Sequence, residues 1–315
     1  MEIIKRSTMS NTLQQSVTQR AHWRDYYELT KPNVVYLMLL TSVIGMFMAT
    51  PGSVPWQILL YGNIGIGLCA AAGAVINHLV DQRIDIIMAR THNRPVAQGR
   101  VSRSGAAIFA TVLAITGMGI LLTQINQLTA WLTFFSLVGY AGVYTLWLKR
   151  ATPQNIVIGG LPGAAPPLLG WVAVTNSVDG HGLLLMLIVF AWTPPHFWAL
   201  AIHRRDDYAK AGIPMLPVTH GIKYTAYHIM LYTLVLIAAT LLPFATGMCG
   251  PLYLIGATVL GLIFLYWAIQ IMREKPKAPM ATFKFSILYL MMLYMIMLAD
   301  HYLFPVVRRA GEVVL

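Results

Sequence analysis

Charged side chains are scarce in this sequence of 315 residues. Asp, Glu, Lys and Arg make up only 10% of it and hydrophobic residues make up 57%. Soluble globular proteins carry about 25% charged residues, because a surface that faces water needs them. Helices surrounded by lipid need almost none except near their ends. The composition therefore excludes a soluble fold and predicts an integral membrane protein.

Cysteine is nearly absent as well, with Cys69 and Cys249 as the only two. They form no metal-ligand spacing, so neither a thiolate metal site nor a disulfide-stapled fold is supported. Residues 1–24 are rich in Ser, Thr and Gln and have no apolar stretch of the kind found in a cleaved signal peptide. We expect residues 1–28 to form a disordered or amphipathic cytoplasmic arm and residues 306–315 to form a C-terminal tail.

Nine apolar runs are long enough to cross a hydrocarbon core, which takes about 20 helical residues. Continuous apolar runs such as residues 183–191 lack the alternation of a membrane-spanning strand. The sequence therefore predicts an all-α polytopic membrane protein whose transmembrane domain covers residues 29–305. The expected spans are residues 33–50, 55–80, 103–123, 128–148, 154–174, 182–203, 223–247, 251–272 and 284–304.

Basic residues are concentrated on one side of these spans. Of the 22 Lys and Arg residues, 20 precede span one or follow spans two, four, six and eight, and only Arg308 and Arg309 follow span nine. The positive-inside rule then places the N-terminus in the cytoplasm and the C-terminus outside. The net charge of +11 needs no nucleic-acid partner. We expect a bacterial inner membrane, and a mitochondrial inner membrane stays open because the N-terminal arm also has few acids.

A polar motif stands at the inner end of span two. Asn77, Asp81 and Asp85 are four residues apart, so on a helix they share one face about 12 Å long. Mg²⁺ takes one or two carboxylates and completes its shell with water and phosphate oxygens. The alternative is a solvated helix end whose acids pair with Arg83 and Arg90. Ionisable groups at membrane depth favour a functional site.

A second polar motif stands at the inner end of span six. Its spacings of seven and four residues place His196, His203 and Asp207 on one helical face. Pro194 and Pro195 interrupt the helical hydrogen bonds, so we expect a kink just before His196. A lone histidine in a span is more often a hydrogen-bond partner between helices than a ligand. Two histidines on one face, beside a kink, favour a site.

Span five is dense in Gly and Pro between residues 159 and 171. This density fits close helix packing through small residues. It also fits a broken wall of a ligand cavity, and both interpretations can hold together. Just before this span, Lys149 and Arg150 either meet a diphosphate or only mark the cytoplasmic side.

These features together resemble the UbiA-type intramembrane prenyltransferases. The similar residues are the NxxxD motif at 77–81, Asp85 four residues on, and the RTxxRP stretch at 90–95. Most of that family has aspartates where this chain has His196 and His203. Histidines at these positions are similar to the branch of the family that acts on haem, as are residues 159–171 and 194–218. The resemblance runs from Leu29 to span nine.

The resemblance implies a helical bundle around a central cavity. It implies a transferase that moves the farnesyl group of farnesyl diphosphate to a vinyl group of haem b, with addition of water, giving haem O. It implies Mg²⁺ as cofactor, the lipid bilayer as surroundings, and haem A synthase or terminal oxidase assembly as downstream partners. The implied metal ligands are Asn77, Asp81, Asp85, Asp206 and Asp207. The implied diphosphate-binding residues are Asn77, Arg90, Arg94, Lys149 and Arg205, and the implied catalytic residues are Asp81, Asp85, His196 and His203.

Neutral imidazole is a common ligand of haem iron and a less natural ligand of Mg²⁺ than carboxylate. We therefore expect His196 and His203 to bind haem or to activate the water that is added, with a role at the diphosphate left open. A family member acting on an aromatic quinone precursor is the alternative, although it would be expected to keep aspartates here. A transporter is less favoured, because the acids cluster at the cytoplasmic mouth and not at midspan.

Overall fold

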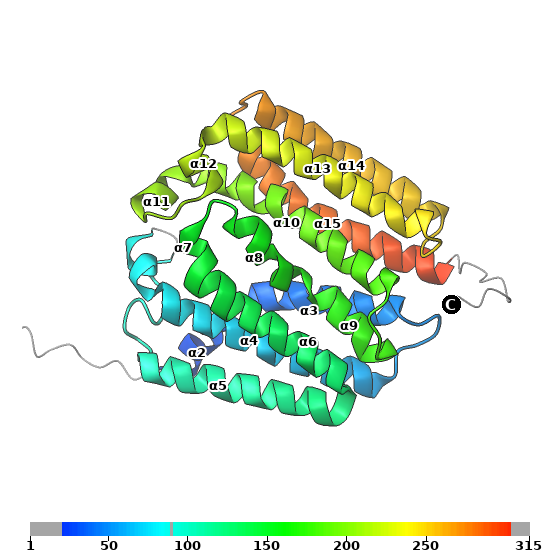
Figure 1. Cartoon of the computed structure of the whole chain (residues 1–315), viewed down its shortest axis with the longest axis horizontal. Helices are drawn as coiled ribbons and strands as arrows, with labels where there is room; N and C mark the ends of the chain where they lie inside the picture. Colours follow the sequence, from blue (N-terminus) through cyan, green and yellow to red (C-terminus); the bar gives the residue numbers. More distant parts are fainter. Residues whose placement is uncertain (1–20, 89–90, 304–315) are drawn as a thin grey trace, which may run out of the picture.

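The structure, a computed structural model, describes residues 21–88 and 91–303. Within this part of the chain every regular element is helical and there is no strand. The long helices lie side by side in a bundle, with the short helices α7, α11 and α12 gathered at one end (Figure 1). The predicted all-α membrane fold is therefore confirmed.

Eight helical segments of the described residues are long and apolar enough to cross a membrane. A ninth is reached when α2 (Trp23–Leu29) and the 17-residue helix α3 (Pro32–Met48) are counted as one span, although the pair bends by 53°. Each of the nine expected spans coincides with one of these segments. The eight are Trp56–Ile87 (α4), Arg103–Ile125 (α5 and η1), Gln127–Leu148 (α6 and η2), Asn155–Thr175 (α8 and α9), Gly180–His203 (α10), Gly221–Ala245 (α13), Pro251–Met272 (α14) and Ala278–Leu303 (α15).

Helix α2 occupies the end of the expected N-terminal arm. His22 and Asp25 cap its first turn. The His22 side chain accepts a hydrogen bond from the backbone N–H of Arg24, and the Asp25 side chain accepts one from the backbone N–H of His22. Asp25 also pairs with Arg100, whose guanidinium donates to the carbonyl of Asn93 at 2.7 Å. The helix is thereby tied to the loop that follows α4. Residues 1–20 of the arm and the tail 306–315 lie outside the described residues.

Span five is divided, as the density of Gly and Pro suggested. Helix α8 (Asn155–Ala164) ends before Ala165 and α9 (Pro166–Thr175) begins with two prolines, which need no N–H partner in a first turn. Span six differs, because α10 continues unbroken through Pro194 and Pro195 to His203. The expected kink there does not end the helix.

The small residues of span five bring two backbones into contact. A Cβ added to Gly170 of α9 would lie 2.0 Å from the carbonyl oxygen of Ser42 on α3. A Cβ added to Gly45 of α3 would lie 2.0 Å from the carbonyl oxygen of Pro167 on α9. Neither position has room for any side chain. The close-packing interpretation of this segment is therefore confirmed.

Two π-helical stretches end spans three and four. One is η1 (Leu121–Ile125), after α5 (Arg103–Ile120), and the other is η2 (Gly139–Leu148), after α6 (Gln127–Val138). A π-helical turn inserts an extra residue and rotates everything that follows it, and such turns are frequent at functional sites. The second stretch leads directly into α7 (Lys149–Ala151), which begins with a lysine named in the sequence analysis.

The ends of spans two and six pack against the same apolar core. Met88, just after α4, belongs to the same buried cluster as Ile202 near the end of α10 and Tyr208 of α11 (Arg205–Lys210). The short helix α12 (Leu216–Thr219) adds Leu216 to this cluster. Both polar motifs therefore lie at the same end of the bundle.

Candidate active site

Helix α4 extends seven residues past the expected end of span two, to Ile87. Asp81 and Asp85 are therefore helical and share one face with Asn77, as their spacing predicted. The exposed fractions of the three residues are 4% for Asn77, 1% for Asp81 and 3% for Asp85. A solvated helix end would leave these groups in water, so that alternative is wrong.

Asn77 and Asp81 lie between two lysines. Lys31 Nζ donates to Asn77 Oδ1 at 2.5 Å, and Asn77 Nδ2 donates to Asp81 Oδ2 at 2.9 Å. Lys149 Nζ lies 2.5 Å from the same Asp81 oxygen. A buried carboxylate needs a nearby cation and hydrogen bonds to remain charged, and Asp81 has both.

Asp85 is held by the loop that follows α4. Arg94 Nη1 lies 2.7 Å from each of its two carboxylate oxygens. Thr91 Oγ1 donates to the Asp85 carbonyl at 3.2 Å, and Gln82 Nε2 donates to the carbonyl of Val96 at 3.0 Å. These bonds fix the loop against the helix. Arg90, the other basic candidate in this loop, lies outside the described residues.

We call this group the first-motif cluster; its members are Lys31, Asn77, Asp81, Asp85, Arg94 and Lys149. Asp81 Oδ1 is buried and has no hydrogen-bond partner within the described residues. An orphaned carboxylate oxygen beside a second carboxylate and an amide is a donor set that suits Mg²⁺. Among the described residues, no group of three or more His, Cys, Asp or Glu side chains is arranged so that it could bind a metal ion. A metal here would depend on two carboxylates, the amide and oxygens from a ligand.

Lys31 is the member that the sequence did not predict, because there it counted only as a topology signal. It joins α2 to α3 with a left-handed backbone, φ 51°, immediately before Pro32. Burial and, to a smaller extent, the charges of Arg94 and Lys149 lower the pKa of its ammonium group to about 7, against the opposing effect of Asp81 and Asp85. The only feature of the sequence that could have indicated this role is that Lys31 lies within the region that resembles the UbiA family, which begins at Leu29.

The second motif is arranged differently from the prediction. Helix α10 ends at His203, because Arg204 leaves the helical conformation with φ −111° and ψ 27°. Asp207 belongs to the separate helix α11. The predicted common face of His196, His203 and Asp207 is therefore wrong. His196 is buried, whereas His203 is exposed.

His196 is enclosed by aromatic rings. Its ring stacks on Trp192 with centroids 4.2 Å apart and on Phe283 with centroids 4.6 Å apart. Its Nδ1 atom lies 2.6 Å from Ser286 Oγ on α15. The ring is thus fixed in place by its own helix and by the neighbouring helix α15.

Asp206, Asp207 and Arg205 of the second motif are more exposed to solvent than His196. Asp206 is exposed, and Asp207 pairs with Arg204 at 3.5 Å. Arg205 is exposed and its Nε donates to the Pro217 carbonyl at 3.0 Å. The structure does not bring these residues into hydrogen-bond contact with the first-motif cluster.

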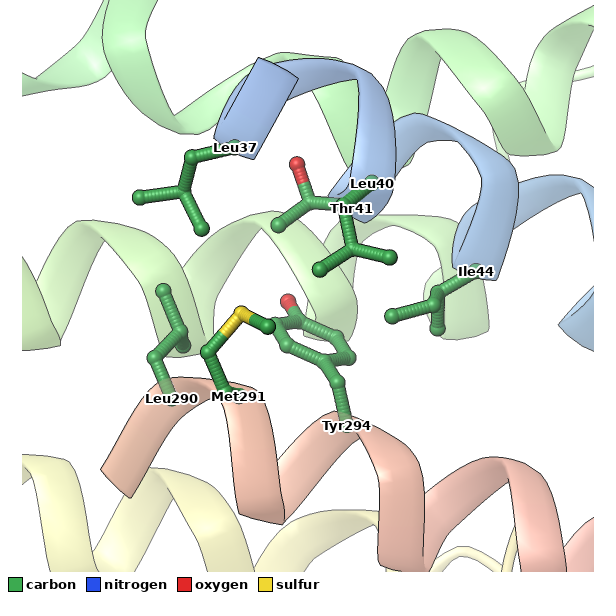
Figure 2. Close-up of a pocket in the computed structure, with 7 residues that line it drawn as sticks. All are labelled: Leu37, Leu40, Thr41, Ile44, Leu290, Met291 and Tyr294. Carbon is green, nitrogen blue, oxygen red and sulfur yellow. The ribbon is translucent and has the colours of Figure 1, made fainter. Parts of the chain in front are cut away.

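An apolar crevice lies between α3 and α15, and Figure 2 shows side chains of the two helices facing each other across it. Its two hydroxyl groups already have partners, since Thr41 Oγ1 donates to the Met38 carbonyl and the Tyr294 hydroxyl donates to the Leu185 carbonyl. The crevice therefore offers only apolar contact. It is lined by Leu37, Leu40, Thr41, Ile44, Leu290, Met291 and Tyr294.

Comparison with known proteins assigns the family. Residues 38–296 match the UbiA prenyltransferase family. The chain belongs to that family. Among its curated relatives, the protoheme IX farnesyltransferase of Teredinibacter turnerae is 63% identical and the match covers 97% of this chain and 98% of the relative. The enzyme of the same name from Saccharophagus degradans is 65% identical, with 90% of this chain and 94% of the relative covered.

Solved structures of UbiA proteins have the same fold. A structure of digeranylgeranylglyceryl phosphate synthase superimposes with a TM-score of 0.76 at 19% identity, covering 89% of this chain and 98% of its own. A UbiA homologue from Archaeoglobus fulgidus bound to GPP and Mg²⁺ gives a TM-score of 0.59 at 15% identity, covering 87% of this chain and 99% of its own. This chain is therefore a multi-pass membrane transferase of the UbiA family.

Proposed function

We propose that this protein transfers the farnesyl group of farnesyl diphosphate to a vinyl group of haem b and adds water, giving haem O. Its curated relatives from two bacteria carry the name protoheme IX farnesyltransferase. The observation that carries the proposal is the first-motif cluster, in which the buried carboxylates of Asp81 and Asp85 lie among three partly buried cationic side chains at one end of the bundle. Such a cluster suits a diphosphate that must leave as an anion.

Ionisation of the donor is the first step. The bond between C1 of the farnesyl group and the diphosphate oxygen breaks, and its electron pair leaves with the diphosphate. Lys31, Arg94 and Lys149 stabilise the charge that develops on the leaving group. Fixed cations in a site shielded from water act strongly on such charge, since little solvent screens them. Arg90 and Arg205 are further candidates for the same role.

Asn77, Asp81 and Asp85 are the residues that would hold Mg²⁺, and the unpartnered Oδ1 of Asp81 supports this assignment. When bound, the metal would neutralise phosphate oxygens of the substrate and so assist departure of the diphosphate. The A. fulgidus homologue with GPP and Mg²⁺ supports the same pairing of metal and prenyl diphosphate. Asp206 and Asp207, at the same end of the bundle, form the second acidic patch.

Transfer to the acceptor follows. The terminal carbon of the haem vinyl group forms a bond to C1 of the farnesyl group, and the positive charge moves to the vinyl carbon beside the pyrrole. Water bonds to that carbon and loses one proton, which leaves a hydroxyethylfarnesyl side chain. His196, buried near the inner end of α10, binds the haem, and His203 is a candidate to orient haem or to take up the proton.

The bundle lies in a bacterial inner membrane with the N-terminus and both polar motifs on the cytoplasmic side. The distribution of basic residues supports this orientation. The product then passes to an enzyme that oxidises haem O, a haem A synthase, or to assembly of a terminal oxidase.

Purified protein incubated with haem b, farnesyl diphosphate and Mg²⁺ tests the proposal. We expect mass spectrometry to show haem that has gained one farnesyl group and one hydroxyl group. Excess chelator should abolish this product, and added Mg²⁺ should restore it. An aromatic quinone precursor offered in place of haem should stay unmodified. Prenylation of that precursor with haem left unchanged would contradict the proposal.

A further inference from the structure

The bond between His196 and Ser286 determines where the proton of the imidazole ring lies. Ser286 Oγ is 2.6 Å from His196 Nδ1 and 2.7 Å from the carbonyl oxygen of Phe283, one turn earlier on α15. Both His196 and Ser286 are buried. A hydroxyl group has one hydrogen, so it can donate to only one of these two neighbours.

Only one arrangement satisfies all three groups. If Ser286 donated to Nδ1, its oxygen would face the carbonyl oxygen of Phe283 at 2.7 Å with no hydrogen between them. Two acceptors at that distance repel each other. The hydroxyl therefore donates to Phe283 and accepts a hydrogen bond from His196 Nδ1–H. The neutral ring then carries its free lone pair on Nε2.

Hydrogen bonds to Ser286 also fix the orientation of the His196 ring. Trp192 lies one turn before His196 on α10, and its Nε1–H donates to the backbone carbonyl of Ser286 at 2.7 Å. Ser286 thus receives one hydrogen bond from each of two stacked rings. No hydrogen bond of the described residues involves His196 Nε2, and this atom is not among the fully buried polar atoms that lack a partner. Nε2 therefore keeps some accessible surface and stays available to a ligand.

We propose that Ser286 is a positioning residue that holds His196 as the Nδ1–H tautomer, so that Nε2 binds the iron of haem b. This inference rests on the proposed function, because it assigns the acceptor's iron to a specific atom. Histidines that bind metals nearly always donate their other N–H to an oxygen, which fixes the tautomer and makes the ligand more basic. Ser286 and His196 have this relationship across two helices.

Titration of the purified full-length protein with ferric haem b tests the assignment, with the Soret band as the readout. Wild-type protein should give the band of histidine-ligated haem, and His196→Ala should lose it. Ser286→Ala should weaken haem affinity about 10–100-fold, the usual effect of removing the partner of a metal-binding histidine. Ser286→Thr keeps a hydroxyl group and should restore the affinity. Imidazole added to the His196→Ala protein should restore the ligated band.

A matched control comes from the same helix. Thr282 is buried one turn before Ser286, and its hydroxyl donates only to the Ala278 carbonyl at 2.8 Å. Thr282→Val therefore removes a buried hydroxyl without touching His196, and its haem titration should equal that of the wild type. Farnesyl diphosphate affinity should be the same in all of these variants.

Four results would overturn the inference. Two are an unchanged Soret band in His196→Ala and an unchanged haem affinity in Ser286→Ala. The third is an equal loss in Ser286→Ala and Thr282→Val, which would indicate general loosening of α15. The fourth is a loss confined to farnesyl diphosphate affinity. Failure of the proposed function is distinguishable, because then the wild-type protein would form no farnesylated haem whatever its haem spectrum.

Discussion

Lys149 and Asp81 are 68 residues apart in the sequence, and their side chains meet at 2.5 Å inside the bundle. The pair joins the end of η2 to the end of α4. Only one carboxylate oxygen, Oδ2, takes part, and Oδ1 is left buried without a partner. Lys149 thus pairs with one oxygen of Asp81, and the other oxygen stays available for a ligand.

Asp81→Asn should abolish product formation while the protein still folds. The amide keeps the shape of the side chain but removes the charge that a metal and diphosphate site needs, so activity should fall about 100-fold or more. Because Lys149 would lose its buried partner, Tm should fall as well. Product mass and thermal unfolding in detergent measure the two effects.

The double variant Asp81→Asn with Lys149→Met separates stability from catalysis. Removing both charges should recover much of the lost Tm without recovering activity. Glu274→Gln is the control, since this acid is exposed and its pair with Lys223 at 3.5 Å contributes little. Undiminished turnover of Asp81→Asn would remove the metal and diphosphate assignment.

Lys31→Met should raise the KM for farnesyl diphosphate. A hydrogen bond to a charged group contributes about 1.5–3 kcal/mol, which corresponds to roughly 10-fold or more in affinity. Lys31→Gly suits the left-handed backbone at φ 51° and should raise KM equally, which would assign the effect to the ammonium group and not to the turn. Lys223→Met, on the exposed surface, should leave KM unchanged. Normal kinetics in both Lys31 variants would place this residue outside the binding site.

A reporter that is active only in the cytoplasm should be silent when it is fused after Val314. The expectation follows from the 20 basic residues on one side of the spans and from nine crossings of the membrane. The same reporter inserted after Lys275, between α14 and α15, should be active. Activity at the C-terminal fusion would mean that the number of spans is wrong by one.

Gly170→Val should destabilise the bundle strongly. The new Cβ would meet the carbonyl oxygen of Ser42 at 2.0 Å, so α3 and α9 would have to separate. Overpacking of this kind costs about 1–3 kcal/mol or more, which a lower Tm in detergent would record. Gly163→Ala on α8 has open space around the added carbon and should not lower Tm. Equal Tm values for the two variants would argue against the close contact.

Much of the fold could be predicted from the sequence because lipid imposes simple rules. Apolar length locates the spans, and the four-residue spacing of Asn77, Asp81 and Asp85 is a local property of a helix. The partners of these residues are not local. Arg83 was named as a partner only in the alternative of a solvated helix end. Lys149 and Arg94 pair with the acids, because the fold and not the spacing brings them together.

The second motif shows where spacing alone fails. No Gly or Pro marks the end of α10 after His203, so the helical pattern seemed to continue through Arg204 to Asp207. A turn of only one residue is enough to destroy the predicted common face. The role of Ser286 was equally hidden, since nothing in the sequence relates it to a histidine 90 residues away.

The length of α4 determines the depth of the reaction. Its 32 residues extend for ~48 Å, whereas the hydrocarbon layer is only ~30 Å thick. In the proposed orientation the last turns, with Asp81 and Asp85, therefore reach the level of the lipid headgroups. A prenyl diphosphate would be held across the boundary, with its anion on the water side and its chain in the bilayer. The two products would then separate by solubility, the diphosphate into water and the prenylated haem into lipid.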